Sequence, residues 1–214
     1  MPQAAPAPLK QRDLWNGATG ETWVRKQAQL DAMLDPMTAP TIAALGDIAG
    51  RKVLDIGCGA GTTTFALEQA VGPNGEASGV DISEPLIAYA RERARQMHSA
   101  VRFTTADAGA DTLEDAPYDT LFSRFGVMFF EYPVAALSHL RASLKPNGAM
   151  AFVCWRGVDE NRWNALPADA IAPLLPHKPP APDPSAPGAD GVRQPASHAR
   201  PAQQAGWKNV TIEP

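Results

Sequence analysis

The residues best placed to do chemistry form one short run in which Asp55 precedes Gly57, Gly59 and Gly61. An apolar stretch leads into the run, and a helical segment opens at Thr62. A strand, a glycine turn and a helix N-terminus in succession predict a ligand site at the carboxyl end of a strand. Glycines permit positive φ and close approach of a ligand, and the helix N-terminus offers unpaired N–H groups. An ordinary strand-to-helix turn has the same pattern, so the loop alone does not identify the ligand.

The spacing of the glycines separates two kinds of nucleotide cofactor. Dinucleotide sites use G-x-G-x-x-G, whereas here Thr62 stands at the third glycine position and Gly61 comes one residue early. The G-x-G-x-G form after an acid resembles motif I of the class I S-adenosylmethionine-dependent methyltransferases. The resemblance implies S-adenosylmethionine as cofactor, with binding residues Asp55, Gly57, Cys58, Gly59 and Gly61. Cys58 is interpreted as a small loop residue, not a nucleophile.

A second carboxylate, Asp81, lies 20 residues after Gly61 at the end of a second expected strand. That interval places an acid beside a nucleoside ribose, where it accepts hydrogen bonds from both hydroxyls. Asp81 and the adjacent Ile82 are therefore predicted cofactor residues. The alternative is that Asp81 only caps the next helix, although Ser83 is at least as good a cap.

A third strand, residues 101–105, is followed by Asp107 and Ala108. In the family that this chain resembles, an acid here accepts from the adenine amine, and the next backbone N–H donates to the ring. Asp107 and Ala108 match that position. A solvated loop aspartate is the alternative, because the same loop carries other acids.

The later segments continue the resemblance from about residue 50 to residue 155. Residues 118–124 predict a fourth strand, and Ser123 at its exit is a further predicted cofactor residue. Leu137, Leu140 and Leu144 share a helical face, residues 145–148 predict a turn, and 149–155 a buried fifth strand. The fold implied is α/β: a Rossmann-like, doubly wound, mostly parallel sheet flanked by helices. The final antiparallel strand pair of the family is incomplete.

The rest of the chain divides by composition. Residues 1–12 are rich in Pro and Ala and predict a disordered arm, and residues 13–175 predict the methyltransferase domain with N-terminal cap helices. Trp15 and Trp23 in the cap are candidates for the cavity wall or for plain packing. Residues 176–206 predict a poorly ordered segment that lacks an apolar helical face, and residues 207–214 a sixth strand.

Composition narrows the partners. The net charge is −4 and no basic patch is present, which disfavours nucleic acid. No apolar run is long enough to span a membrane and no signal peptide is evident, so the cytoplasm is the expected location. The His, Cys and Asp residues show no metal-ligand spacing, and no catalytic base is identified. The oligomeric state is left open.

Three functions follow from these observations. The first is methyl transfer to a small molecule, lipophilic or aromatic if the apolar run at 127–130 faces the acceptor. Core packing explains that run equally well. The second is a catalytically idle S-adenosylmethionine-binding protein with a truncated or altered C-terminus. The third, an NAD(P)-dependent oxidoreductase, is disfavoured by Thr62 and Gly61.

Overall fold

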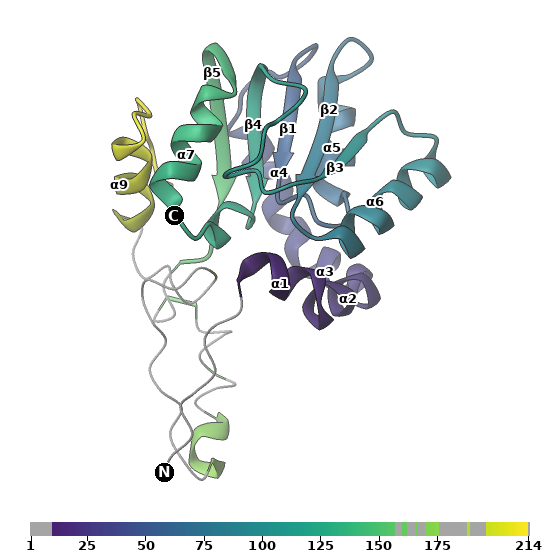
Figure 1. The fold of residues 1–214 in the computed structure, drawn as a ribbon, viewed down its shortest axis with the longest axis vertical. Helices are drawn as coiled ribbons and strands as arrows, with labels where there is room; N and C mark the ends of the chain where they lie inside the picture. The colour runs from purple at the N-terminus through teal and green to yellow at the C-terminus, as the bar shows by residue number, and fades with distance from the viewer. Residues whose placement is uncertain are drawn as a thin grey trace.

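Five parallel strands form the sheet of this protein (Figure 1). A computed structural model describes residues 10–156, 160–161, 166, 170–175, 188 and 196–213. The strand order is β3-β2-β1-β4-β5. The strands are β1 (Lys52–Ile56), β2 (Glu76–Asp81), β3 (Arg102–Thr105), β4 (Tyr118–Arg124) and β5 (Leu144–Val153). The order reverses at β1, so its carboxyl end is where a ligand site is expected. The predicted α/β fold is confirmed.

Helices cover both faces of the sheet because successive residues of a buried strand point to opposite sides. Val53 packs with Leu67 and Val71 on one face, whereas Leu54 packs with the residues of α7 on the other. The first face carries α4 (Thr38–Ala43), α5 (Thr62–Val71) and α6 (Glu84–Met97), and the second carries α7 (Pro133–Ala142) and α9 (Ala196–Gln204). Short 3-10 turns follow β4 at Val127–Phe129 and lie at Ala172–Leu174.

An N-terminal cap of helices lies at the carboxyl ends of the strands (Figure 1). It consists of α1 (Gln11–Asn16), α2 (Ala18–Arg25), α3 (Gln27–Leu34) and a 3-10 turn at Asp35–Met37. The predicted disordered arm, residues 1–12, extends too far, because α1 begins at Gln11. Residues 1–9 lie outside the described part of the chain. The cap therefore begins at Gln11, and α1 lies beside the exit of β2.

The start of β5 differs from the sequence prediction. Leu144 belongs to the strand and not to the preceding helix. The predicted turn is a bulge inside the strand: Tyr118 pairs with Leu144 and Thr120 with Ala149. Asn147 takes a φ of 63° in this bulge. The bulge holds these turn-forming residues, and the backbone pairing with β4 continues on both sides of them.

The C-terminal segment also departs from the prediction. Residues 207–213 form no strand, and α9 shows that residues 196–204 of the expected poorly ordered segment are helical. Ala202 and Ala205 are buried against the core, and the Trp207 Nε1–H donates to the Leu137 carbonyl at 2.9 Å. Small alanines and one tryptophan therefore supply a packing face in a segment that was predicted to lack one.

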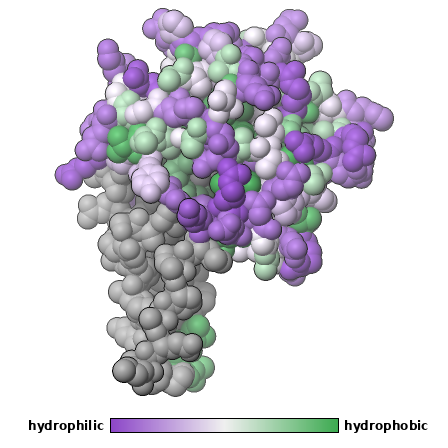
Figure 2. Space-filling view, viewed as in Figure 1, coloured by the Kyte–Doolittle hydropathy of each residue, from purple (hydrophilic) through white to green (hydrophobic). Residues whose placement is uncertain are grey.

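Hydrophilic side chains cover most of the face shown in Figure 2, apart from the grey region. Green residues there form small separate patches and no broad apolar surface. Within the described residues, no helix is long and apolar enough to cross a membrane.

Candidate active site

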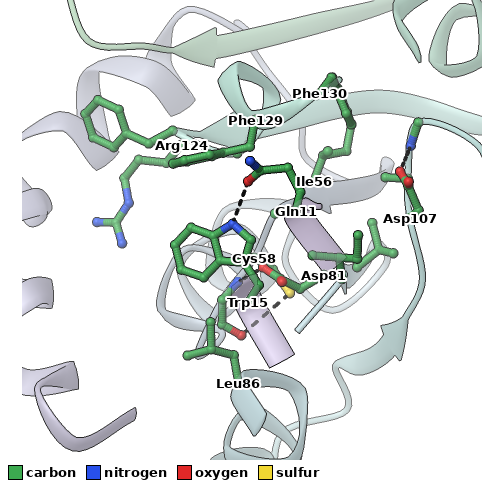
Figure 3. A pocket seen from close by; sticks show the side chains of 18 of the residues that line it. Gln11, Trp15, Ile56, Cys58, Asp81, Leu86, Asp107, Arg124, Phe129 and Phe130 are labelled. Carbon is green, nitrogen blue, oxygen red and sulfur yellow. Dashed lines mark hydrogen bonds between the residues drawn. The ribbon is translucent and has the colours of Figure 1, made fainter. Parts of the chain in front are cut away.

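A cavity of about 740 Å³ lies between the cap and the carboxyl ends of the strands. Seven predicted cofactor residues line it: Gly57, Cys58, Gly59, Asp81, Ile82, Asp107 and Ala108. Figure 3 shows the Trp15 indole in the middle of this view, with Asp81 and Cys58 close to it and Asp107 and Arg124 on opposite sides. The structure therefore brings together residues from the exits of β1, β2 and β3.

The glycine loop takes a conformation that other residues rarely adopt. Gly57, Gly59 and Gly61 have φ values of 67°, 54° and 84°. A Cβ on Gly57 would lie 2.6 Å from the Gly126 Cα, so this glycine lets two backbone segments meet. A Cβ on Gly59 would have no described protein atom within 4 Å. The loop thus leaves open space at Gly59, on the cavity side, where a ligand can approach the backbone.

Asp81 connects the ends of two strands. Its Oδ2 accepts the Gly59 N–H at 2.8 Å, and its Oδ1 accepts the Ser83 N–H at 2.9 Å. Burial raises the pKa of Asp81, and the two backbone hydrogen bonds oppose that rise. Each oxygen has a second lone pair available, so the carboxylate could still accept ribose hydroxyls.

Asp55 lies beneath the loop and does not line the cavity. It is fully buried, and its Oδ2 accepts the hydroxyls of Thr63 at 2.5 Å and Thr64 at 2.7 Å. Burial raises the pKa of Asp55 to about 6, against the two hydroxyls and the Arg124 charge. Its Oδ1 is buried with no hydrogen-bond partner in the described structure. The prediction of a direct contact with cofactor is therefore replaced by a role in positioning the first turn of α5.

Gly61 and Ser123 are also absent from the cavity wall. A Cβ on Gly61 would meet the Phe103 ring at 2.6 Å, so this glycine lets the loop pack on β3. The Ser123 Oγ–H donates to the Ile56 carbonyl at 2.8 Å, and Ser123 Oγ accepts the Gly126 N–H at 3.2 Å. Both residues hold the strand exits in place behind the site.

The loop after β3 presents Asp107 and Ala108 to the cavity. Asp107 Oδ1 accepts the Gly109 N–H at 2.9 Å, and Asp111 Oδ2 accepts the Asp107 N–H at 2.9 Å. The His139 Nε2 lies 2.9 Å from the Asp111 carbonyl. Hydrogen bonds within the loop and to α7 thus hold this aspartate at the cavity edge, which argues against a freely solvated side chain.

Aromatic side chains form part of the cavity wall. The Trp15 ring meets the Trp23 ring edge-on at 5.4 Å and the Phe129 ring at 5.2 Å. Trp15 and Trp23, the two cap candidates, both line the cavity. Further lining residues were not singled out in the sequence, namely Leu30, Asp31, Met33, Leu34 and Trp155. The first four lie on α3 of the cap, and Trp155 follows β5.

The described residues contain no group of three or more His, Cys, Asp or Glu side chains arranged to hold a metal ion. Cys58 is buried in the loop, and burial raises the pKa of its thiol well above the ordinary value. A thiol of this kind stays protonated near neutral pH and is a poor nucleophile. The described cavity thus combines a glycine loop and strand-end carboxylates with an aromatic wall.

Comparison with known proteins agrees with this geometry. Residues 53–148 match the family model described as "Methyltransferase domain". Demethylmenaquinone methyltransferase of Staphylococcus aureus is 36% identical over 104 residues, which cover 49% of this chain and 43% of the relative. The chain therefore spans less than half the length of the curated relatives it matches.

Two solved structures show the same fold. A SAM-dependent methyltransferase from Aquifex aeolicus superposes with a TM-score of 0.61 at 20% identity, covering 84% of this chain and 87% of that one. Magnesium protoporphyrin IX methyltransferase from Synechocystis PCC 6803, with bound SAH, gives 0.61 at 20% identity, covering 91% and 86%. Residues 53–148 thus match a methyltransferase domain, and the fold of most of the chain is the one seen in S-adenosylmethionine-dependent methyltransferases.

Proposed function

We propose that this chain transfers the methyl group of S-adenosylmethionine to a small lipophilic or aromatic molecule. One observation carries the proposal. A single cavity joins the loop of Gly57–Gly59 and the carboxylates of Asp81 and Asp107 to a wall of Trp15, Trp23 and Phe129. The polar end suits a nucleoside, and the aromatic wall suits an apolar acceptor.

The residues present fit the cofactor. Asp81 would accept the ribose hydroxyls, and Asp107 with the Ala108 N–H would hold the adenine edge. The open space at Gly59 leaves room for the sulfur-bearing chain close to the backbone. Ile82 lines the cavity next to Asp81 and would pack against the nucleoside. Asp55 supports this arrangement from below through Thr63 and Thr64.

The chemistry that the cofactor supplies is an activated methyl group on a sulfonium, open to direct displacement. The protein has to hold the acceptor in line and keep water out. Correct orientation alone lowers a barrier by on the order of 7–11 kcal/mol in favourable cases. The Trp15, Trp23 and Phe129 rings are rigid and apolar, so they are suited to both tasks.

A dedicated base is not evident around the cavity. No histidine is among the lining residues that the structure describes, and the Cys58 thiol is protonated. The carboxyl groups on the wall include Asp31 and Asp81, which accept hydrogen bonds from neighbouring groups, and also Asp13, Asp107 and Glu131. An acceptor atom that is nucleophilic without help, or one whose proton is acidic in itself, would need no base among them.

The test is a methyl-acceptor assay. The protein is incubated with methyl-labelled S-adenosylmethionine and a panel of lipophilic phenols, quinols and small polar amines, and label transfer is counted. Demethylmenaquinone is the first acceptor to try, because the curated relatives are named for it. We expect transfer to an apolar acceptor and none to the amines. Transfer to the polar amines alone would contradict the acceptor class.

A catalytically idle S-adenosylmethionine binder is the second candidate. It would bind the cofactor in the same cavity, so the acceptor assay decides between the two functions. Binding of S-adenosylhomocysteine without transfer to any acceptor in the panel would support this alternative and contradict methyl transfer.

A further inference from the structure

Asp31, on the cap helix α3, reaches the first residue of α5. The Thr62 hydroxyl donates to Asp31 Oδ2 at 2.5 Å, and Gln27 Nε2 donates to the same oxygen. The Asp31 side chain is 24% exposed. Because Thr62 directly follows the last glycine of the loop, this hydrogen bond joins the cap to the point where the loop becomes a helix.

Arg93, on α6, holds the same point from the other side. Its Nη1 donates to the Ala60 carbonyl at 2.6 Å and to the Thr62 hydroxyl oxygen at 2.8 Å. Its Nη2 lies 4.0 Å from Asp31 Oδ2. Thr62 therefore accepts from Arg93 and donates to Asp31, so that one hydroxyl links three elements.

A second arginine ties Asp31 to the sheet. Arg124 Nη2 at the end of β4 lies 3.8 Å from Asp31 Oδ1, and its Nη1 donates to Thr38 Oγ1 at 2.9 Å. The Arg124 side chain is only 8% exposed, so its charge is largely removed from water. Breaking one partner of such a pair leaves the other charge uncompensated. Arg124 is thus engaged by the cap.

The other end of the cap is fastened beside Asp81. Asn16 Nδ2 donates to the Ile82 carbonyl at 2.9 Å, and Asn16 Oδ1 accepts the Glu84 N–H at 2.9 Å. The Ser83 hydroxyl donates to the Trp15 carbonyl at 2.7 Å. The cap therefore bridges the cofactor cleft, with one attachment on the ribose side and one at the glycine loop.

We infer that Asp31 is a positioning residue that couples the cap to the glycine loop, through Thr62 and the two arginines. Closing the cap over the cavity and ordering the loop for cofactor are then one event. The aromatic wall for the acceptor, carried by Trp15 and Trp23, is set in place as the cofactor binds. The inference rests on cofactor binding in this cavity and does not depend on which acceptor is methylated.

The experiment measures S-adenosylhomocysteine affinity by calorimetry and amide exchange of residues 27–34 with and without saturating ligand. It compares the parent protein with Asp31→Asn, which removes the charge at nearly constant volume. Thr62→Val, which removes the linking hydroxyl, gives a second route to the same break. Glu21→Gln is the matched control, because Glu21 is an exposed cap acid whose partner is Arg25 at 3.9 Å.

In the parent and in Glu21→Gln, ligand should slow exchange in residues 27–34 by at least about fivefold. In Asp31→Asn and Thr62→Val, affinity should fall roughly tenfold, and ligand at saturation should leave α3 exchange within about twofold of the ligand-free rate. Equal slowing in the parent and both variants would overturn the inference, as would affinities within about twofold of the parent. No binding to the parent would instead overturn the cofactor site itself.

Discussion

The Asp81 carboxylate accepts the Gly59 backbone N–H at 2.8 Å, so the acid at the end of β2 and the glycine loop after β1 form one unit. The same carboxylate accepts the Ser83 N–H and lies on the cavity wall. A single side chain thus shapes the loop and faces the expected ribose. Its removal should affect both binding and stability.

Asp81→Ala should weaken S-adenosylhomocysteine binding at least about tenfold, because two ribose hydroxyls and two backbone N–H groups lose their acceptor. It should also lower the free energy of unfolding by about 1–3 kcal/mol. Glu76→Ala is the control, since Glu76 is exposed at the other end of β2 and pairs only with Arg102 in the described residues. Calorimetry and urea unfolding measure both effects. An affinity equal to that of Glu76→Ala would place the ribose elsewhere.

Alanine at Gly57 and at Gly59 should have different effects although both glycines have positive φ. At Gly57 the new Cβ would meet the Gly126 backbone at 2.6 Å, so the loss should appear as reduced thermal stability. At Gly59 the Cβ would enter open space, so the folding cost is limited to the backbone conformation, about 1–2 kcal/mol.

The larger effect of Gly59→Ala should be on ligand affinity, and Gly59→Val should be worse because Val is β-branched. Thermal melts and calorimetry on the same samples separate the two effects. If Gly59→Val binds S-adenosylhomocysteine as the parent does, this part of the loop does not meet the ligand.

Stability should depend on pH through Asp55. Burial raises its pKa from 3.8 to about 6, so the folded protein holds this proton more tightly than the unfolded chain. The contribution to stability is fully present below about pH 4 and is lost as pH rises through about 6. The free energy of unfolding should therefore fall by up to about 3 kcal/mol over this window.

Asp55→Asn keeps an oxygen for the Thr63 and Thr64 hydroxyls and cannot ionise, so it should flatten this slope. Urea unfolding at several pH values measures the effect. Part of the slope should remain, because burial also raises the pKa of Asp81. An identical slope in Asp55→Asn and the parent would show that Asp55 titrates normally.

The C-terminal segment should contribute to stability more than to binding. Trp207→Ala removes the hydrogen bond to the Leu137 carbonyl and the packing against α7, and should cost about 2–3 kcal/mol. S-adenosylhomocysteine affinity should stay within about twofold of the parent, since Trp207 does not line the cavity. Rapid amide exchange throughout residues 196–206 of the parent would contradict this packing.

The glycine spacing and the acids at the strand ends predicted the first three strands and the residues at their exits. The sequence could not distinguish residues that line the cavity from residues that hold the backbone behind it. Asp55 and Ser123 belong to recognisable motifs, yet both point into the protein and hold the backbone. From the sequence, Thr62 only argued against a dinucleotide motif. In the structure its hydroxyl donates to Asp31 and accepts from Arg93.

The C-terminal prediction failed for a different reason. Residues 189–205 contain Val192 as their only branched apolar residue, so the sequence alone indicated no apolar face for a helix there. Ala202 and Ala205 are small enough to bring α9 close to α7, and Arg141 Nε caps the helix end at the Ala205 carbonyl, 3.0 Å away. Such packing depends on a tertiary partner, which periodicity within one segment does not reveal.

The measurement that tests the central claim most directly is calorimetric titration of the full chain with S-adenosylhomocysteine and, separately, with NADH. We predict binding of S-adenosylhomocysteine in the micromolar range, roughly −8 kcal/mol, and no heat of binding with NADH. Tight NADH binding without any response to S-adenosylhomocysteine would contradict the assignment of this cavity to S-adenosylmethionine.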